Sequence, residues 1–167
     1  EAAAARGAEV VLVSGPVTID APSGVTIVRV ETAAEMAKAT LERVEWSTLI
    51  VKSAAVADYR PTAVADRKIK KSGETMTIEL EKTQDILAAV GAVKGDRMLV
   101  GFAAETDDLV ANARKKLESK NADLIVANDV TLDGAGFDGD TNIAVIVGRN
   151  GQADELPMMS KRKLADR

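Results

Sequence analysis

The sequence predicts an α/β fold, a doubly wound and mainly parallel sheet with an added β-hairpin. Two observations predict it. Short runs that are apolar along their whole length alternate with amphipathic helical segments, which is typical of parallel strands covered on both faces. The stretch Lys68–Leu80 breaks this alternation and shows the period-two pattern of a hairpin, which we interpret as a flap over a site or a dimerisation arm.

Six apolar runs are predicted to be strands of the main sheet: Val10–Val13, Val25–Val30, Thr48–Val51, Met98–Phe102, Asp123–Ala127 and Asn142–Val147. Asn150-Gly151 is a strong hairpin turn and predicts a further short strand at Ala153–Leu156. In the extra hairpin, Lys68–Lys71 and Thr75–Leu80 are expected to pair around Ser72-Gly73-Glu74.

Three helices are expected between these strands, and each has a signal at its start. Thr32–Arg43 begins with a capping box at Thr32 and Glu35, and Asp85–Val93 follows a cap at Thr83. Thr106–Lys120 has Asp107 and Asp108 in its first turn. The two ends also look helical. Glu1–Arg6 is a strong helix former stopped by Gly7, without a cap, and Ser160–Arg167 resembles an opening turn. We expect one domain over residues 1–167, truncated in front of Glu1 by a strand and a loop, with its C-terminus a second candidate for truncation.

The composition limits the kinds of function. A chain of 167 residues suits one domain, and a formal net charge of −4 argues against a general nucleic-acid binder. Because the chain has no cysteine and no histidine, thiol nucleophiles, Ser-His triads and His-based zinc sites are excluded. No apolar run approaches the roughly 18–20 residues that span a membrane. We expect a cytoplasmic protein that acts on small molecules, with neither nucleic acid nor membrane as a partner.

Ligands of open parallel sheets bind outside the carboxyl ends of the strands. Four predicted strand ends are small or polar after an apolar run: Ser14-Gly15-Pro16, Lys52-Ser53-Ala54-Ala55, Phe102-Ala103-Ala104-Glu105 and Asn128-Asp129. Any single one of them is equally consistent with an ordinary loop, but four that converge favour a site. With His and Cys absent, charge stabilisation by Lys, Arg and backbone amides remains, which suits phosphoryl or nucleotidyl transfer.

Two groups of lysines can each be interpreted as ligand contacts or as ordinary surface residues. Lys116 and Lys120 stand four apart on a predicted helix and would repel, so an anion between them would relieve that cost, although a solvated surface explains such pairs more often. Lys68, Lys70 and Lys71 can serve a ligand or can protect an edge strand from aggregation. The dinucleotide and P-loop glycine motifs are not in the sequence.

A series of motifs resembles a known family: Ser14-Gly15-Pro16-Val17, Ala54-Ala55-Val56-Ala57-Asp58-Tyr59-Arg60, Lys68-Ile69-Lys70-Lys71, Gly101-Phe102-Ala103-Ala104-Glu105-Thr106 and Ala127-Asn128-Asp129-Val130. In this order they closely resemble the phosphopantothenate–cysteine ligases, whose bacterial members are usually fused behind a flavin-dependent decarboxylase. The resemblance covers nearly the whole chain. It implies an enzyme of coenzyme A biosynthesis with a Rossmann-like fold, a homodimer, and FMN only on the fused decarboxylase domain.

The resemblance also implies a reaction and a set of site residues. The carboxylate of 4′-phosphopantothenate would attack the α-phosphate of CTP, and cysteine would then attack the acyl-cytidylate, releasing CMP. Lys68 would be the catalytic lysine, and Asp58 would contact the nucleotide through Mg²⁺. The other nucleotide contacts implied are Lys52, Ser53, Ala54, Gln84, Asp85, Ile86, Leu87, Phe102, Lys116 and Lys120.

The chain departs from the family in two places. Relatives often have Asn-Pro-Asp-Ile where this chain has Thr83-Gln84-Asp85-Ile86, which leaves the role of Gln84 open. The family's first strand, its glycine-rich loop and the following segment with a required asparagine do not occur in the sequence, so residues 1–167 alone are expected to have little or no ligase activity. Two other functions remain open: a Rossmann-type NAD(P)-dependent reductase with Tyr59 as proton donor, and a non-catalytic nucleotide-binding or oligomerisation module.

Overall fold

The computed structural model describes residues 1–70, 73–105, 107–129, 131 and 139–167. Its strands are β1 (Val11–Ser14), β2 (Thr26–Arg29), β3 (Leu49–Lys52), β4 (Tyr59–Pro61), β5 (Leu80–Lys82), β6 (Met98–Glu105), β7 (Leu124–Asp129), β8 (Thr141–Gly148) and β9 (Ala153–Ser160). Its helices are α1 (Ala2–Ala5), α2 (Ala33–Leu41), α3 (Ile86–Val93), α4 (Leu109–Ser119) and α5 (Lys161–Ala165). None of the helices described is both long and apolar enough to cross a membrane.

The central sheet has five strands in the order β3-β6-β7-β8-β9. β3, β6 and β7 run parallel to one another, whereas β8 and β9 are added antiparallel. The turn between β8 and β9 contains Asn150-Gly151, and Gly151 adopts the positive φ of +80° that this turn chemistry predicts. The predicted α/β class with a mainly parallel sheet is confirmed, and the hairpin at its end is also confirmed.

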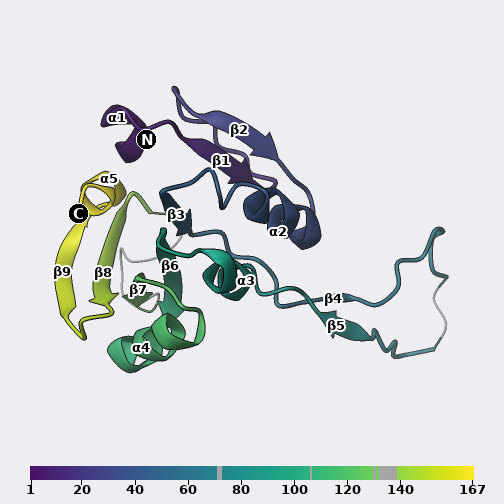
Figure 1. Ribbon diagram of the computed structural model, residues 1–167. Helices are drawn as coiled ribbons and strands as arrows, with labels where there is room; N and C mark the ends of the chain where they lie inside the picture. The colour runs from purple at the N-terminus through teal and green to yellow at the C-terminus, as the bar shows by residue number, and fades with distance from the viewer. Residues whose placement is uncertain (71–72, 106, 130, 132–138) are drawn as a thin grey trace.

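β1 and β2 form a separate, two-stranded parallel sheet, which lies beside the central sheet (Figure 1). Among the described residues, β1 and β3 are not paired by strand hydrogen bonds. A slot of about 880 Å³ separates them, and it is lined by residues of β1, β3 and α2. The single continuous sheet expected from the sequence is therefore divided in two among the described residues.

The core lies mostly on one face of the central sheet. α2, α3 and α4 supply Ala37, Val90 and Leu117 to a cluster that also contains Leu99 of β6 and Ile125 of β7. α5 covers part of the opposite face, where Leu164 packs near Val126 and Ala144. On that second face, Leu49, Val51 and Met98 are each about half exposed, so the expected cover on both faces is uneven.

The predicted hairpin forms at a different place. β4 pairs with β5 at the base of a long arm that runs out to the right of the view in Figure 1, supported by an Arg60–Glu81 ion pair of 2.7 Å. Thr75–Glu79 and Lys68–Lys70 are not strands, and Lys71 and Ser72 lie outside the described residues. Met76 and Ile78 are well exposed, and an alternating pattern without a core to pack on does not stabilise a two-stranded ladder.

Two predicted helix starts are also corrected. Asp85, not Thr83, caps α3 by accepting a hydrogen bond from Ala88 N–H, while the Thr83 hydroxyl donates to Ala57 C=O. α4 begins at Leu109, so Asp107 and Asp108 precede its first turn, and Thr106 lies outside the described residues. The capping box of Thr32 and Glu35 on α2 is confirmed.

Candidate functional site

The candidate site lies at the carboxyl ends of β3 and β6, beside the start of α3. β3 and β6 are parallel and in register from Leu49↔Met98 to Lys52↔Gly101, so both strands deliver their ends to one edge of the sheet. α3 follows β5 and starts at this edge, and α4 follows β6. The sheet and two helices thereby place lysines and carboxylates from distant parts of the sequence in one region.

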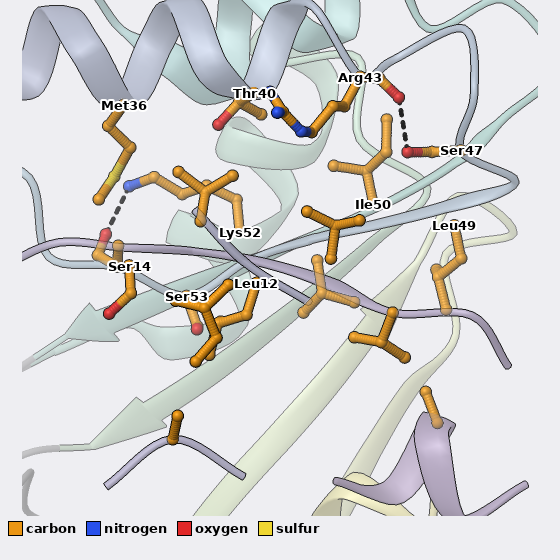
Figure 2. A pocket seen from close by; sticks show the side chains of 18 of the residues that line it. Leu12, Ser14, Met36, Thr40, Arg43, Ser47, Leu49, Ile50, Lys52 and Ser53 are labelled. Carbon is orange, nitrogen blue, oxygen red and sulfur yellow. Dashed lines mark hydrogen bonds between the residues drawn. The ribbon is translucent and has the colours of Figure 1, made fainter. Parts of the chain in front are cut away.

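Lys52 stands at the end of β3 with a partly buried side chain. Its Nζ donates to the carbonyl of Ala54 at 2.7 Å, and Figure 2 shows it at the end of the slot that also holds Ser14 and Met36. Burial lowers the pKa of the Lys52 ammonium, a nearby Lys116 lowers it further, and Asp85 and Asp58 act in the opposite direction. Asp85, Asp58 and Lys116 therefore lie within electrostatic reach of Lys52.

Asp85 links α3 to α4. One of its oxygens accepts from Ala88 N–H at 2.9 Å, and the other is 2.7 Å from the Nζ of Lys120. Burial raises the pKa of the Asp85 carboxyl, but the hydrogen bonds from Lys120 and Ala88 outweigh this effect, so the pKa is lowered overall. Asp85 is therefore a carboxylate at neutral pH, and Lys120 is held beside the start of α3.

Lys116 also has an acidic partner. Its Nζ lies 2.7 Å from Oε1 of Glu105 at the end of β6, and the Nδ2 of Asn112 donates to the other oxygen at 3.3 Å. The mutual repulsion expected for Lys116 and Lys120 is thus already balanced by one carboxylate each. In the sequence, Glu105 stands out only as part of a polar strand end, because nothing in the spacing shows that it meets α4.

The other predicted nucleotide contacts differ in how a ligand reaches them. Gln84 is exposed, but Ile86 and Leu87 form the first turn of α3 with their side chains buried in the core, which leaves their backbone for a ligand. Ser53 and Ala54 are exposed in the loop after β3. Phe102 is 37% exposed, and the alternation along β6 places it on the face of the sheet opposite Ala103 and α3.

Asp58 and Lys68 lie along the chain that enters the arm. Asp58 is exposed just before β4, and its carbonyl accepts from Thr83 N–H at 2.9 Å. Lys68 is exposed on the arm beyond β4, which extends away from α3 and α4 in Figure 1. The structure therefore gathers Lys52, Lys116 and Lys120, and it holds Lys68 apart from them.

The four predicted strand ends converge only in part. The ends of β3, β6 and β7 belong to one sheet, although Phe102–Glu105 and Asn128-Asp129 are inside longer strands than expected. The Ser14-Gly15 end of β1 faces this group across the slot. Within the described ranges there is no group of three or more acidic side chains that could enclose a metal ion. A lone carboxylate such as Asp58 still suits Mg²⁺, which usually binds one or two carboxylates together with substrate phosphates.

Comparisons with known proteins relate the chain to a family. The family model described as the DNA/pantothenate metabolism flavoprotein C-terminal domain matches residues 1–167. The chain is 51% identical to the coenzyme A biosynthesis bifunctional protein CoaBC of Bacillus subtilis over 96% of its own length, and 45% identical to CoaBC of Escherichia coli over 98%. It spans only 40% and 41% of those two relatives.

Solved structures give the same fold. A crystal structure of the C-terminal domain of CoaBC matches with a TM-score of 0.80 and 40% identity, over 98% of this chain and 72% of that one. A Cab2 mutant in complex with phosphopantothenate-cysteine matches with a TM-score of 0.63 and 16% identity, over 80% of this chain and 47% of that one, which shows a shared fold. The chain belongs to the family of DNA/pantothenate metabolism flavoprotein C-terminal domains.

Proposed function

We propose that the protein to which this chain belongs joins 4′-phosphopantothenate to L-cysteine at the expense of CTP, as a phosphopantothenate–cysteine ligase. The observation that carries the proposal is the group of Lys52, Lys116 and Lys120 at the carboxyl ends of β3 and β6, within a family whose relatives are coenzyme A biosynthesis proteins. The ligand of the Cab2 complex, phosphopantothenate-cysteine, is the product that this reaction would give.

In the first step, a carboxylate oxygen of phosphopantothenate attacks the α-phosphorus of CTP, and the bond to pyrophosphate breaks. Negative charge builds up on the phosphate oxygens, and fixed cations stabilise such charge most effectively. Lys116 and Lys120 would hold the triphosphate, and the backbone at Ser53 and Ala54 would lie against the nucleotide. Lys68 would reach the reacting phosphate from the arm of its own chain or of a partner in a homodimer.

In the second step, the neutral amine of cysteine attacks the acyl carbon of the acyl-cytidylate. The carbon–oxygen bond to CMP breaks, the amide forms, and the amine gives up a proton. Asp58 would hold Mg²⁺, which would neutralise part of the charge on the phosphates. FMN belongs in this proposal only to a decarboxylase domain fused elsewhere in the full protein.

Replacement of Lys68 by Gln in the full-length protein tests the proposal. Loss of the ammonium should slow acyl-cytidylate formation by about 100-fold, as removal of a single charge-stabilising donor does in other enzymes. Pyrophosphate release from CTP with phosphopantothenate, measured in a single turnover, reports this step directly. Lys70→Gln, two residues along the same arm, is the matched control and should remain within twofold of the unchanged protein.

The same assay separates the other candidate functions. A nicotinamide reductase would change absorbance with NAD(P)H and release no pyrophosphate. A non-catalytic module would bind CTP without turnover. Either result with the full-length protein would sink the ligase proposal, and equal rates for Lys68→Gln and the unchanged protein would remove Lys68 from the catalytic role.

A further inference from the structure

Glu105 is a largely buried carboxylate at the edge of the candidate site. Its side chain is 14% exposed, and its Oε1 is covered almost completely. The Nζ of Lys116 lies 2.7 Å from this oxygen as an ion pair, but no donor among the described residues is aligned with it as a hydrogen bond. Asn112 supplies the one amide donor, on the other oxygen, at 3.3 Å.

Asp85, which pairs with Lys120, differs from Glu105 in exposure and in role. Asp85 is about half exposed, and it has a structural role besides its ion pair with Lys120 because it caps α3. Among the described residues, Glu105 caps no helix, and both of its side-chain contacts come from α4, at Asn112 and Lys116. Removing a carboxylate from water costs free energy unless a cation lies beside it. The largely buried position of Glu105 therefore favours one location of the Lys116 ammonium, next to Oε1.

A lysine held in this way is prepared for a ligand. A free lysine side chain has large rotamer freedom, and a ligand that must order it loses affinity. The ammonium of Lys116 has three donors, of which Glu105 can take one, and the side chain is 41% exposed. Because the side chain stays exposed, a ligand can reach the remaining donors, and Lys52 lies within electrostatic reach of Lys116.

We propose that Glu105 is a positioning residue: it fixes the Lys116 ammonium where the phosphate chain of the nucleotide binds. This inference rests on the proposed function, because it assigns a phosphate chain to the lysine cluster. Glu105 itself does not touch the reacting atoms. Its loss should therefore weaken nucleotide binding in the ground state and the transition state alike, which raises the KM for CTP and leaves kcat nearly unchanged.

The test uses the full-length protein with Glu105→Gln, Glu105→Asp, Lys116→Met and the double variant Glu105→Gln/Lys116→Met. Glu105→Gln should raise the KM for CTP by about tenfold, within the range of coupled contacts, and Glu105→Asp should recover part of the loss. In the Lys116→Met background, Glu105→Gln should have no further effect. Lys115→Met, an exposed neighbour on the same helix, is the matched control, and a melting curve checks the fold of each variant.

The outcomes separate the inference from the function on which it rests. A lower KM in Glu105→Gln would mean that the carboxylate repels the ligand, and an undiminished effect in the Lys116→Met background would mean that Glu105 acts through another group. Either would overturn the proposal while CTP turnover stands. If the unchanged protein turns over no CTP, the proposed ligase function fails instead. The same four variants are then compared by the calorimetrically measured binding of inorganic triphosphate. If that measurement shows no energetic coupling between Glu105 and Lys116, the role of Glu105 is overturned.

Discussion

At the scale of single residues, Asp123 forms a network of charge contacts away from the candidate site. Asp123 precedes β7 and contacts the Nζ of Lys94 at 2.9 Å, the N–H of Leu99 at 2.7 Å and the Nε of Arg149 at 3.2 Å. Lys94 is only 5% exposed. This network links the end of α3 to the beginnings of β6 and β7. It therefore lies at the edge of the sheet opposite to the candidate site.

Asp123→Asn keeps the shape of the side chain and removes its charge. We expect a loss of about 3 kcal/mol in the free energy of unfolding at pH 7, because Lys94 then stays buried without a counter-ion. Urea titration measures this loss. Asp96→Asn, at an exposed turn nearby, is the control and should change the stability by no more than about 0.5 kcal/mol.

The same residue predicts a pH dependence. Burial raises the pKa of the Asp123 carboxyl, but the bonds from Lys94 and Leu99 outweigh it, so the folded pKa lies below the ordinary value of 3.8. A lowered folded pKa gives stability that is present above that value and disappears as the pH falls through the folded pKa. The difference between the unchanged protein and Asp123→Asn should therefore shrink below about pH 4. A difference that stays constant down to pH 2.5 would contradict this explanation.

At the scale of elements, the contact between α3 and α4 depends on Gly91. A Cβ at this position would lie 1.9 Å from the carbonyl oxygen of Lys120, and that carbonyl is backbone, which cannot move aside cheaply. The side chain of Asn121 also donates to Gly91 C=O at 2.7 Å. The close approach brings the end of α4, and with it Lys120, next to the helix that Asp85 caps.

Gly91→Ala should therefore destabilise the protein, although the same change in an exposed helix stabilises by about 1 kcal/mol. We expect a loss of about 2–3 kcal/mol from the forced separation of α3 and α4, measured by thermal or urea unfolding. Ala92→Ser, on the exposed side of the same helix, controls for the helix itself. An increase in melting temperature for Gly91→Ala would show that the helices do not approach as described.

At the scale of the whole molecule, the division of the sheet leaves backbone groups on both sides of the slot without strand partners among the described residues. Met98 N–H bonds to Thr48 C=O, so in a parallel ladder Met98 and Val100 pair with β3 while the backbone of Leu49 and Val51 points to the slot. By the same alternation, Thr26 N–H bonds to Val10 C=O, and the backbone of Val11 and Val13 points to the slot from the other side. The edges that face each other are thus unpaired among the described strands.

Proline substitutions distinguish paired from unpaired edges. Val51 and Val100 are in register, but only the N–H of Val100 belongs to the ladder between β3 and β6. In residues 1–167, Val100→Pro should prevent cooperative folding or cost at least about 3 kcal/mol, whereas Val51→Pro should cost about 1 kcal/mol or less. Unfolding curves of the two variants give the comparison, and equal losses would mean that the outer edge of β3 is paired after all.

Much of the fold was predictable because the signals are local. Each of the predicted apolar runs became a strand, and the capping box at Thr32 and the turn at Asn150-Gly151 stand where the sequence places them. The errors at Thr83 and in the hairpin have one cause. Several nearby residues could each start a helix or a ladder, and the choice depended on contacts with distant residues. At the start of α4, Asp108 has a positive φ of 42° and therefore stands before the helix rather than in its first turn.

The class of the fold, the chemistry that remains without His and Cys, and the family of the motifs can all be recognised in the amino-acid sequence. The period of the hydrophobic pattern and the identity of the side chains are properties of the chain alone. The pairing of Glu105 with Lys116 and of Asp85 with Lys120, and the separation of the arm that carries Lys68 from both pairs, become visible only in the folded molecule. The physical reason is that strands and helices far apart in sequence come together at the sheet edge, and side-chain spacing within one element cannot reveal partners supplied by another.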